Sequence, residues 1–261
     1  MMCFYHMSGA GNDFVVTDVR DKALDLRALA IRLCKLTGAD GFLAVDRSDS
    51  ADFRLHFYNP DGLRGEMCGN GARCVCKFAF DRGIAGENMT VETDAGLICG
   101  SRLAEDQYRI ALNLPGVLDM ERTADCAYVE LGRPGIPHAV TEVSHLSREN
   151  LRQRGIALRH DPAFPKGANV DFYTRLSPGR VAVLTYERGV EDFTLACGTG
   201  CAAVAVTLWK KGQLPGGKLT AENEGGILTV TLSCADGEIT RLLLEGPAKT
   251  LQILDFEERE R

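Results

Sequence analysis

Cys68-Gly69-Asn70-Gly71 and Cys197-Gly198-Thr199-Gly200 are two copies of one cysteine-led turn, 129 positions apart (197 − 68) in a chain of 261 residues. Each turn opens a stretch that reads as a helix, and each stretch closes on a glycine at the same distance, Gly83 and Gly212. The register between the two stretches holds without a gap. Such a duplication predicts two similar lobes, each with one cysteine at the start of a helix.

The similarity extends to both sides of these helices. Downstream, Thr90-Val91-Glu92 resembles Thr220-Ala221-Glu222 after one inserted residue. Upstream, apolar runs end at Tyr58-Asn59 and at Tyr186-Glu187 in equivalent places. Two similar lobes can hold two cysteines across one cleft, which suits a proton acceptor and a proton donor on opposite sides of one atom.

The apolar pattern along the chain predicts many strands joined by a few helices, an α/β (α+β) architecture. Helices are expected after each cysteine, over Leu24–Leu36 and near Arg148–Arg154. Strands are expected at 14–19, 42–45, 53–58, 108–114, 128–131, 170–173, 181–186, 227–232 and 242–244. We place the domain boundary at Pro115-Gly116, which gives a first lobe of residues 1–116 and a second of residues 117–261, whose last strand is free to return to the first lobe.

Composition excludes several classes of function. The net charge of −6 and the pI near 5.5 disfavour nucleic acid and anionic membranes as partners, because either would require a basic face. No apolar run approaches the roughly 20 residues that span a bilayer. The N-terminus, Met1 to His6, lacks the basic segment and apolar core of a signal peptide. We therefore expect a cytoplasmic protein with reduced thiols.

The ten cysteines are not spaced as a structural zinc site, which uses paired C-x2-C motifs. No metal is expected for this reason. Outside the two turns, the cysteines are expected to be small, mostly buried apolar residues. They are Cys3, Cys34, Cys74, Cys76, Cys99, Cys126, Cys201 and Cys234.

A cysteine at the first turn of a helix has a chemical consequence. The first turn leaves unpaired N–H groups and about half a positive charge at its end. A thiolate is stabilised there, so the sequence predicts thiol pKa values below the free value of about 8.5. The glycines that follow each cysteine leave room for a ligand carboxylate to approach the same N–H groups.

Six segments in a fixed order carry a family resemblance over nearly the whole chain. They are Met7-Ser8-Gly9-Ala10-Gly11-Asn12-Asp13-Phe14, Asn59-Pro60-Asp61-Gly62, Glu66-Met67-Cys68-Gly69-Asn70-Gly71-Ala72-Arg73-Cys74, Pro137-His138, Tyr186-Glu187-Arg188-Gly189 and Ala196-Cys197-Gly198-Thr199-Gly200. Together they resemble the diaminopimelate epimerase family. The resemblance implies two pseudo-symmetric lobes, each a curled mixed β-sheet around a central helix, with the active site in the cleft between them.

The resemblance also implies an activity. Members of the family interconvert LL- and meso-diaminopimelate for lysine and peptidoglycan synthesis, with neither pyridoxal phosphate nor a metal. The partner is then a small amino-acid substrate, and a homodimer stays open as an assembly. Cys68 and Cys197 would be the catalytic pair, one as thiolate removing the α-proton and the other as thiol protonating the opposite face. The N–H groups of Gly69, Asn70, Gly198 and Thr199 would stabilise the carbanion through its carboxylate.

Further roles follow from the resemblance alone. His138 and Glu187 would lie near the thiols and tune their protonation. Substrate contacts would come from Asn12, Asn59, Asn70, Asn169, Glu187 and Arg188, with the Arg188 guanidinium as natural partner of the distal carboxylate. The residues themselves also allow simpler interpretations. His138 reads as a packed surface histidine, Glu187 as a solvated strand end, and Asn59 before Pro60 as a turn residue.

Departures from the family pattern leave the substrate open. Ile136 stands where the family often has asparagine before Pro-His, Leu63-Arg64 replaces a small and an acidic residue, and Asp192-Phe193 replaces Glu-Thr. The stretch Asp40-Gly41-Phe42 lacks a glutamine that some members use. A racemase of another polar amino acid, such as histidine, is therefore an alternative.

Two other classes of function remain open. One is a single-cysteine hydrolase, because Cys68 to Arg73 looks like a phosphatase loop. Four residues separate the cysteine from the arginine, however, where that loop has five, and Cys197 has no role in it. The other is a non-catalytic protein that binds an amino-acid carboxylate at the two helix starts. It would tolerate serine at both cysteines and would not exchange the α-hydrogen.

Overall fold

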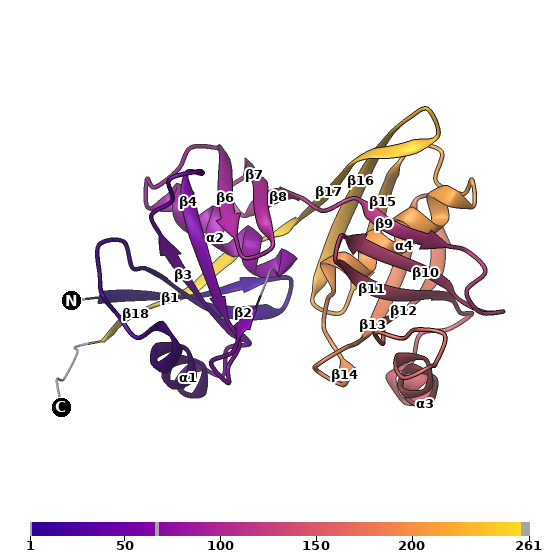
Figure 1. Ribbon diagram of the computed structural model, residues 1–261, viewed down its shortest axis with the longest axis horizontal. Coiled ribbons are helices and arrows are strands. Elements are labelled where there is room, and N and C mark those ends of the chain that lie inside the picture. Colours follow the sequence, from indigo (N-terminus) through magenta and orange to yellow (C-terminus); the bar gives the residue numbers. More distant parts are fainter. Residues whose placement is uncertain (1, 66–67, 257–261) are drawn as a thin grey trace. The chain divides into compact units, whose positions relative to one another are not determined.

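A computed structural model describes residues 2–65 and 68–256 (Figure 1). Glu66 and Met67, which belong to the first cysteine motif, and the charged tail Glu257–Arg261 lie outside the described residues. The chain forms two compact units, Met1–Ile110 with Gly246–Arg261, and Ala111–Glu245. The division falls a few residues before the Pro115-Gly116 boundary expected from the sequence, and the C-terminal segment belongs to the first unit.

The first unit is a mixed sheet with two helices. Its strands pair in the order β18-β1-β2-β3-β4-β6-β7-β8, and β2–β3 and β4–β6 are the parallel pairs. The short β5 pairs with the end of β4. The elements are β1 (Met2–Gly9), β2 (Asn12–Asp18), α1 (Leu26–Thr37), β3 (Gly41–Asp46), β4 (Phe53–Tyr58), β5 (Arg64–Gly65), α2 (Gly69–Asp81), β6 (Asn88–Thr93), β7 (Gly96–Ala104), β8 (Gln107–Ala111) and β18 (Lys249–Phe256).

The second unit repeats this plan element by element. Its strands pair in the order β9-β10-β11-β12-β13-β15-β16-β17, with β11–β12 and β13–β15 parallel, and β14 pairs with the end of β13. The elements are β9 (Pro115–Asp119), β10 (Ala127–Gly132), β11 (Gly135–Glu142), α3 (Arg148–Arg159), β12 (Asn169–Ser177), β13 (Arg180–Glu187), β14 (Asp192–Phe193), α4 (Gly198–Lys210), β15 (Lys218–Asn223), β16 (Gly226–Ala235) and β17 (Glu238–Pro247).

The duplication is visible in single hydrogen bonds at the ends of α2 and α4. Gly83 and Gly212 have φ angles of 65° and 70°, a left-handed conformation that glycine adopts without strain. Each donates its N–H to the carbonyl three residues back, at 3.0 and 2.9 Å. The residue after each glycine donates to the carbonyl five residues back, at 2.8 and 2.9 Å. The glycines that close the two sequence repeats therefore close the helices in the same way.

Each sheet is completed by a strand that follows the last strand of the other repeat. β9 follows β8 in the chain and pairs with β10 of the second unit. β18 follows β17 and pairs with β1 of the first unit. The two repeats are thus connected by an exchange of strands rather than by a single linker.

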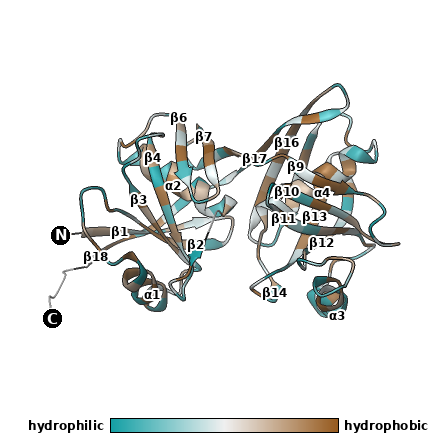
Figure 2. Cartoon of the chain, viewed as in Figure 1, coloured by the Kyte–Doolittle hydropathy of each residue, from teal (hydrophilic) through white to brown (hydrophobic). Residues whose placement is uncertain are grey.

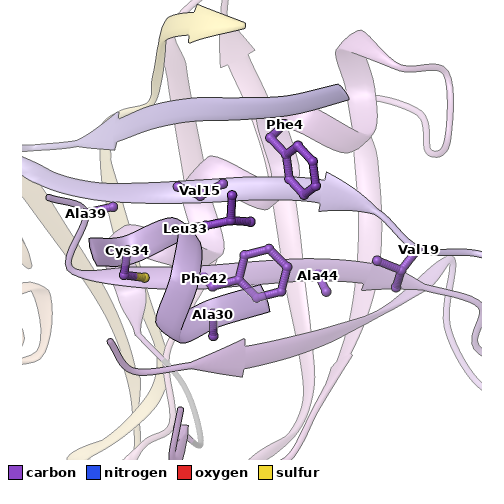
Figure 3. Close-up of a cluster of buried hydrophobic side chains, with 9 residues drawn as sticks. All are labelled: Phe4, Val15, Val19, Ala30, Leu33, Cys34, Ala39, Phe42 and Ala44. Carbon is purple, nitrogen blue, oxygen red and sulfur yellow. The ribbon is translucent and has the colours of Figure 1, made fainter. Parts of the chain in front are cut away.

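Each unit has one inner and one outer helix. α2 packs against β1, β2, β3 and β7, and α4 packs against β10, β11, β12 and β16. Both are buried over most of their length, and Figure 2 shows α4 as largely hydrophobic. α1 lies on the other face of β2 and β3, where Leu33 and Cys34 pack against Val15 and Phe42 (Figure 3). α3 packs in the same way against β12 and β13.

Most expected elements agree with the structure, and two expectations about residues 108–116 are wrong. The strand expected over 108–114 ends at Ala111, and Pro115-Gly116 begins β9 instead of ending an element. Pro115 is tolerated because it is the first residue of a strand. The helix expected near Arg148–Arg154 continues to Arg159. No helix among the described residues is long and apolar enough to cross a membrane.

The expectation of mostly buried cysteines holds for five of the eight outside the turns and is wrong for three. Cys3, Cys99 and Cys234 are exposed. Each lies on a strand, where alternate side chains point to opposite faces, so neighbours such as Phe4 and Ile98 are buried in their place. No disulfide joins any of the cysteines that the structure describes.

Candidate active site

Cys68 is the N-cap residue of α2, with an extended backbone at φ −127° and ψ 124°. The turn Ala10-Gly11, where both φ angles are positive, connects β1 to β2 and places Asn12 beside this helix start. The Sγ atom of Cys68 lies 4.0 Å from Asn12 Oδ1, which also accepts a 3.1 Å hydrogen bond from Asn70 Nδ2. Cys68 is half-buried. The first unit therefore gathers Cys68, Asn12 and Asn70 at one helix end.

A buried arginine holds this group in place. Arg73, in the second turn of α2, is fully buried and donates from Nη2 to Asn70 Oδ1 at 2.8 Å. It also donates from Nη1 to the carbonyl of Gly69 at 3.2 Å. Asn12 in turn donates from Nδ2 to Asp40 Oδ2 at 2.6 Å. The amides of Asn70 and Asn12 are thus fixed in orientation by a chain of hydrogen bonds from a cation to a carboxylate.

Asn59 heads a tight turn between β4 and β5. Its carbonyl accepts the N–H of Gly62 at 2.9 Å, and its own N–H donates to the carbonyl of Leu63 at 2.8 Å. The interpretation of Asn59 as a turn residue is therefore confirmed. Its part in binding a substrate stays a prediction.

Cys197 is the N-cap residue of α4 and is 7% exposed. Its Sγ atom accepts the N–H of Gly200 at 3.4 Å and lies 3.4 Å from Thr199 Oγ1. The thiol therefore occupies the place where a serine or aspartate would cap the helix. Gly198 is buried and Thr199 is half-buried beside it.

The predicted lowering of the thiol pKa is wrong for Cys197 in this structure. Burial raises its pKa well above the ordinary value, and the carboxylates of Glu187 and Asp171 raise it further. The hydrogen bonds from Thr199 and Gly200 act in the opposite direction but do not prevail. The helix end alone favours a thiolate, whereas desolvation and two anions decide the pKa of Cys197.

His138 forms a buried polar cluster with two residues of neighbouring strands. Its side chain is fully buried on β11, and Nδ1 lies 2.8 Å from Oδ2 of Asp171 on β12. The other carboxylate oxygen, Oδ1, accepts a 2.8 Å hydrogen bond from Thr185 on β13. Nε2 of His138 is buried and makes no hydrogen bond with any residue that the structure describes. The interpretation of His138 as a surface histidine is therefore wrong.

The first residue of β12, Asn169, lies beside the end of β13, where Glu187 is the last residue and Arg188 follows it. Asn169 Oδ1 accepts the backbone N–H of Arg188 at 2.8 Å, and its Nδ2 donates to the carbonyl of Pro137 at 3.3 Å. Glu187 accepts a 2.9 Å hydrogen bond from Thr194. The Arg188 side chain is exposed and donates to the carbonyl of Lys166 at 3.1 Å.

Of the residues that depart from the family pattern, Asp40 binds Asn12 beside Cys68, and two others have partners away from the contacts described above. Arg64 is bound to Asp94, with Nη2 2.7 Å from Oδ1 and Nε 2.9 Å from Oδ2. Asp192 pairs with Arg152 at 2.8 Å. Ile136 is half-buried on β11, two residues before His138.

Sequence reasoning missed four residues of these clusters: Arg73, Asp171, Thr185 and Thr194. Asp171 gave the clearest indication, because a charged residue inside the apolar run Val170 to Tyr173 must have a buried partner. Arg73 was part of a quoted motif, but its reach back to Asn70 depends on helical geometry. Among the described residues, no group of three or more His, Cys, Asp or Glu side chains could hold a metal ion.

Comparisons with known proteins identify the relatives of this chain. The sequence model of diaminopimelate epimerase matches residues 4–111 and 133–251. The chain belongs to the diaminopimelate epimerase family. The diaminopimelate epimerase of Aquifex aeolicus is 37% identical over 255 residues, covering 89% of this chain and 90% of that protein. The enzyme of Chlorobaculum tepidum is 35% identical over 257 residues and covers 94% and 97%. The expectations of the family and of an amino-acid epimerase are confirmed.

Solved structures show the same fold in more distant proteins. A phenazine biosynthesis protein of the PhzF family from Bacillus anthracis superimposes with a TM-score of 0.76 at 13% identity, covering 97% of this chain and 98% of that one. A probable proline racemase from Agrobacterium radiobacter gives 0.68 at 17% identity, with 99% and 93% covered. The expected fold, two repeats of a mixed sheet around an inner helix, is confirmed for the family.

Proposed function

We propose that this chain interconverts LL- and meso-diaminopimelate through Cys68 and Cys197, the reaction named for its relatives. The observation that carries the proposal is the pair of equivalent cysteines, each capping the inner helix of its own repeat. Inversion at carbon needs one group to remove a proton and another to supply one on the opposite face. A duplicated thiol satisfies this need, whereas a single-cysteine hydrolase leaves the second copy without a role.

The α-proton of an amino acid is weakly acidic, so the carbanion must be stabilised. Its charge flows into the α-carboxylate, and the N–H groups of Gly69, Asn70, Gly198 and Thr199 are the proposed donors at the two helix starts. Preorganised donors of this kind are each worth about 3 kcal/mol in other enzymes. Asn70 and its neighbour Asn12 are already held in one orientation by Arg73, so little reorganisation is required on binding.

The environments of the two thiols support different roles at rest. Burial, Glu187 and Asp171 keep Cys197 protonated at neutral pH, since they raise its pKa. We assign it as the proton donor in the first half of the reaction, with Cys68 as the acceptor. Reversal exchanges the roles, as the equilibrium between two stereoisomers requires. Arg188 is proposed to bind the distal carboxylate, because its guanidinium is exposed while its backbone is fixed by Asn169.

Deuterium uptake at the α-carbon in D2O tests the proposal directly. We would compare LL-diaminopimelate, meso-diaminopimelate and a panel of single L-amino acids, with reductant present. The expected result is exchange confined to diaminopimelate, with inversion at the α-carbon lost in both Cys68→Ala and Cys197→Ala. Inversion by Cys197→Ala at the wild-type rate would contradict the two-thiol mechanism. Binding without any exchange would favour a binding protein.

A racemase of another polar amino acid is the second candidate, because Ile136 replaces an asparagine on the strand that carries His138. Exchange with a single amino acid but not with diaminopimelate would select it. Ile136→Asn is then the first variant to examine, since it restores the family residue. A cytoplasmic location stays a prediction from the N-terminal sequence and the cysteines, the absence of a nucleic-acid partner stays a prediction from charge, and a homodimer stays open.

A further inference from the structure

Asp171 is a fully buried carboxylate of the second unit. Its side chain is fully inaccessible, both of its oxygens are hydrogen-bonded, and it lies beneath the first turn of α4. A Cβ atom built on Gly200 would lie 2.2 Å from Asp171 Oδ1, so only glycine fits above it. A buried carboxylate is costly unless donors compensate it. Thr185, the His138 ring and the positive end of α4 supply that compensation.

The first unit shows that the fold does not need this carboxylate. Strand register places Asp171 opposite Thr185, and it places Leu43 opposite Phe57 in the equivalent strands. By the same registers, His138 corresponds to Phe14. A Cβ on Gly71, the counterpart of Gly200, would contact the side chains of Leu43 and Phe14.

The equivalent positions beneath the two inner helices are therefore filled differently. Beneath α2 they hold apolar side chains, and beneath α4 they hold a hydrogen-bonded polar cluster. Replacing both partners of a buried hydrogen bond by apolar groups of similar shape is often nearly neutral or stabilising. The polar cluster beneath α4 must therefore have a role other than packing. The polar cluster consists of His138, Asp171 and Thr185. The ring of His138 has one nitrogen, Nε2, that makes no hydrogen bond with any of the described residues.

We propose that Asp171 is a positioning residue that sets the tautomer and orientation of His138. Its carboxylate accepts the Nδ1–H of the ring, so that neutral His138 carries its lone pair on Nε2. Thr185 donates to the other oxygen and prevents the carboxylate from rotating. This inference rests on the proposed function in one respect, namely the role that the family resemblance implies for His138, tuning the protonation of the thiols. The Cys197 thiol interacts electrostatically with both Asp171 and Glu187.

Nitrogen-15 NMR of the histidine ring tests the tautomer without any substrate. The His138 resonances are assigned by their loss in His138→Gln. In the wild-type protein at neutral pH we expect the proton on Nδ1. In Asp171→Asn, which preserves shape, and in Asp171→Leu, which copies Leu43, we expect a shift toward the Nε2–H tautomer. Glu130→Gln is the matched control, since Glu130 is a buried carboxylate of the same unit that is bonded to Tyr128 and Lys166 instead of His138.

Kinetics separate a positioning role from a structural one. Because Asp171 acts through His138, kcat for α-hydrogen exchange should fall by about 100-fold in Asp171→Leu, while KM changes by less than about threefold. A wild-type ring protonated on Nε2, or a tautomer that is unchanged in both variants, overturns the proposal. A changed tautomer with full exchange overturns its catalytic part. No exchange in the wild-type protein contradicts the proposed function and leaves the NMR result to decide the role of Asp171.

Discussion

Gly200→Ala and Gly71→Ala form a matched pair, because the two glycines are equivalent in the repeats and both lie in the first turn of an inner helix. The added methyl group gives each helix the same gain in intrinsic preference, about 1 kcal/mol. The two positions differ in the space that is available to the added methyl group. At Gly200 the Cβ would lie 2.2 Å from Asp171 Oδ1, and at Gly71 it would lie 3.3 Å from the nearest atom of Leu43.

The expected loss of stability follows from these distances. An ordinary contact needs about 3.4 Å, so the Asp171 carboxylate must move by about 1 Å, which breaks at least one of its two 2.8 Å hydrogen bonds. Each such bond to a charged group contributes about 1.5–3 kcal/mol, and overpacking costs about 1–3 kcal/mol more. After the helix gain is subtracted, Gly200→Ala should destabilise the second unit by about 1.5–5 kcal/mol. Gly71→Ala should change stability by less than about 1 kcal/mol, because leucine methyl groups yield easily.

Urea unfolding with two probes measures the difference. The chain has one tryptophan, Trp209 on α4, so its fluorescence reports the second unit, while circular dichroism reports both units. Unfolding of the two variants at the same urea concentration, or wild-type stability of Gly200→Ala, would contradict this prediction. Activity is a second readout: Gly200→Ala should lower the rate of α-hydrogen exchange, since the displaced Asp171 carboxylate is the partner of His138.

Three further predictions concern the thiols. An alkylating reagent at neutral pH should modify half-buried Cys68 before Cys197, whose burial and raised pKa keep it protonated, and mass spectrometry of the peptides gives both rates. Glu187→Gln removes an anion that raises the pKa of Cys197, so alkylation of Cys197 should speed up severalfold, and an unchanged rate would contradict the assignment. Burial raises the pKa of Cys74 and Cys76 to about 12. Both stay protonated in the folded chain while the unfolded chain ionises, so the free energy of unfolding should be constant below about pH 8 and fall by about 1.4 kcal/mol per thiol and pH unit above about pH 9.

Local features were predictable because each depends on a few neighbouring residues. The cysteine turns, the inner helices and their closing glycines follow from backbone requirements that a sequence states directly. The turn at Asn59 follows in the same way from Pro60 and Gly62. Strands such as β18 were missed, since it carries polar and exposed side chains and is defined only by pairing with β1. Pairing over such a sequence distance leaves no periodic pattern.

The chemistry of Cys197 was not predictable from its own helix. The sequence shows the helix start that favours a thiolate, but it does not show that the thiol is 7% exposed with two carboxylates nearby. Those carboxylates, Asp171 and Glu187, come from β12 and β13, whose register fixes their distance to the thiol. Electrostatic effects of this kind act through space, and they become visible only when the strands are aligned.

Comparison of the two repeats shows which residues serve the fold and which serve the chemistry. Sheet order, parallel pairs, inner helices and their final turns are the same in both, and they require only apolar side chains facing the inner helix. Beneath α2 that requirement is met by Leu43, whereas beneath α4 the equivalent place holds Asp171. One backbone thus surrounds one thiol with a buried arginine nearby and the other with the buried Asp171 and the half-buried Glu187. Two thiols in identical surroundings would be protonated to the same extent, whereas the unequal surroundings give the resting enzyme one defined proton donor. We therefore expect substitutions at the positions where the repeats differ to alter the reaction without altering the fold.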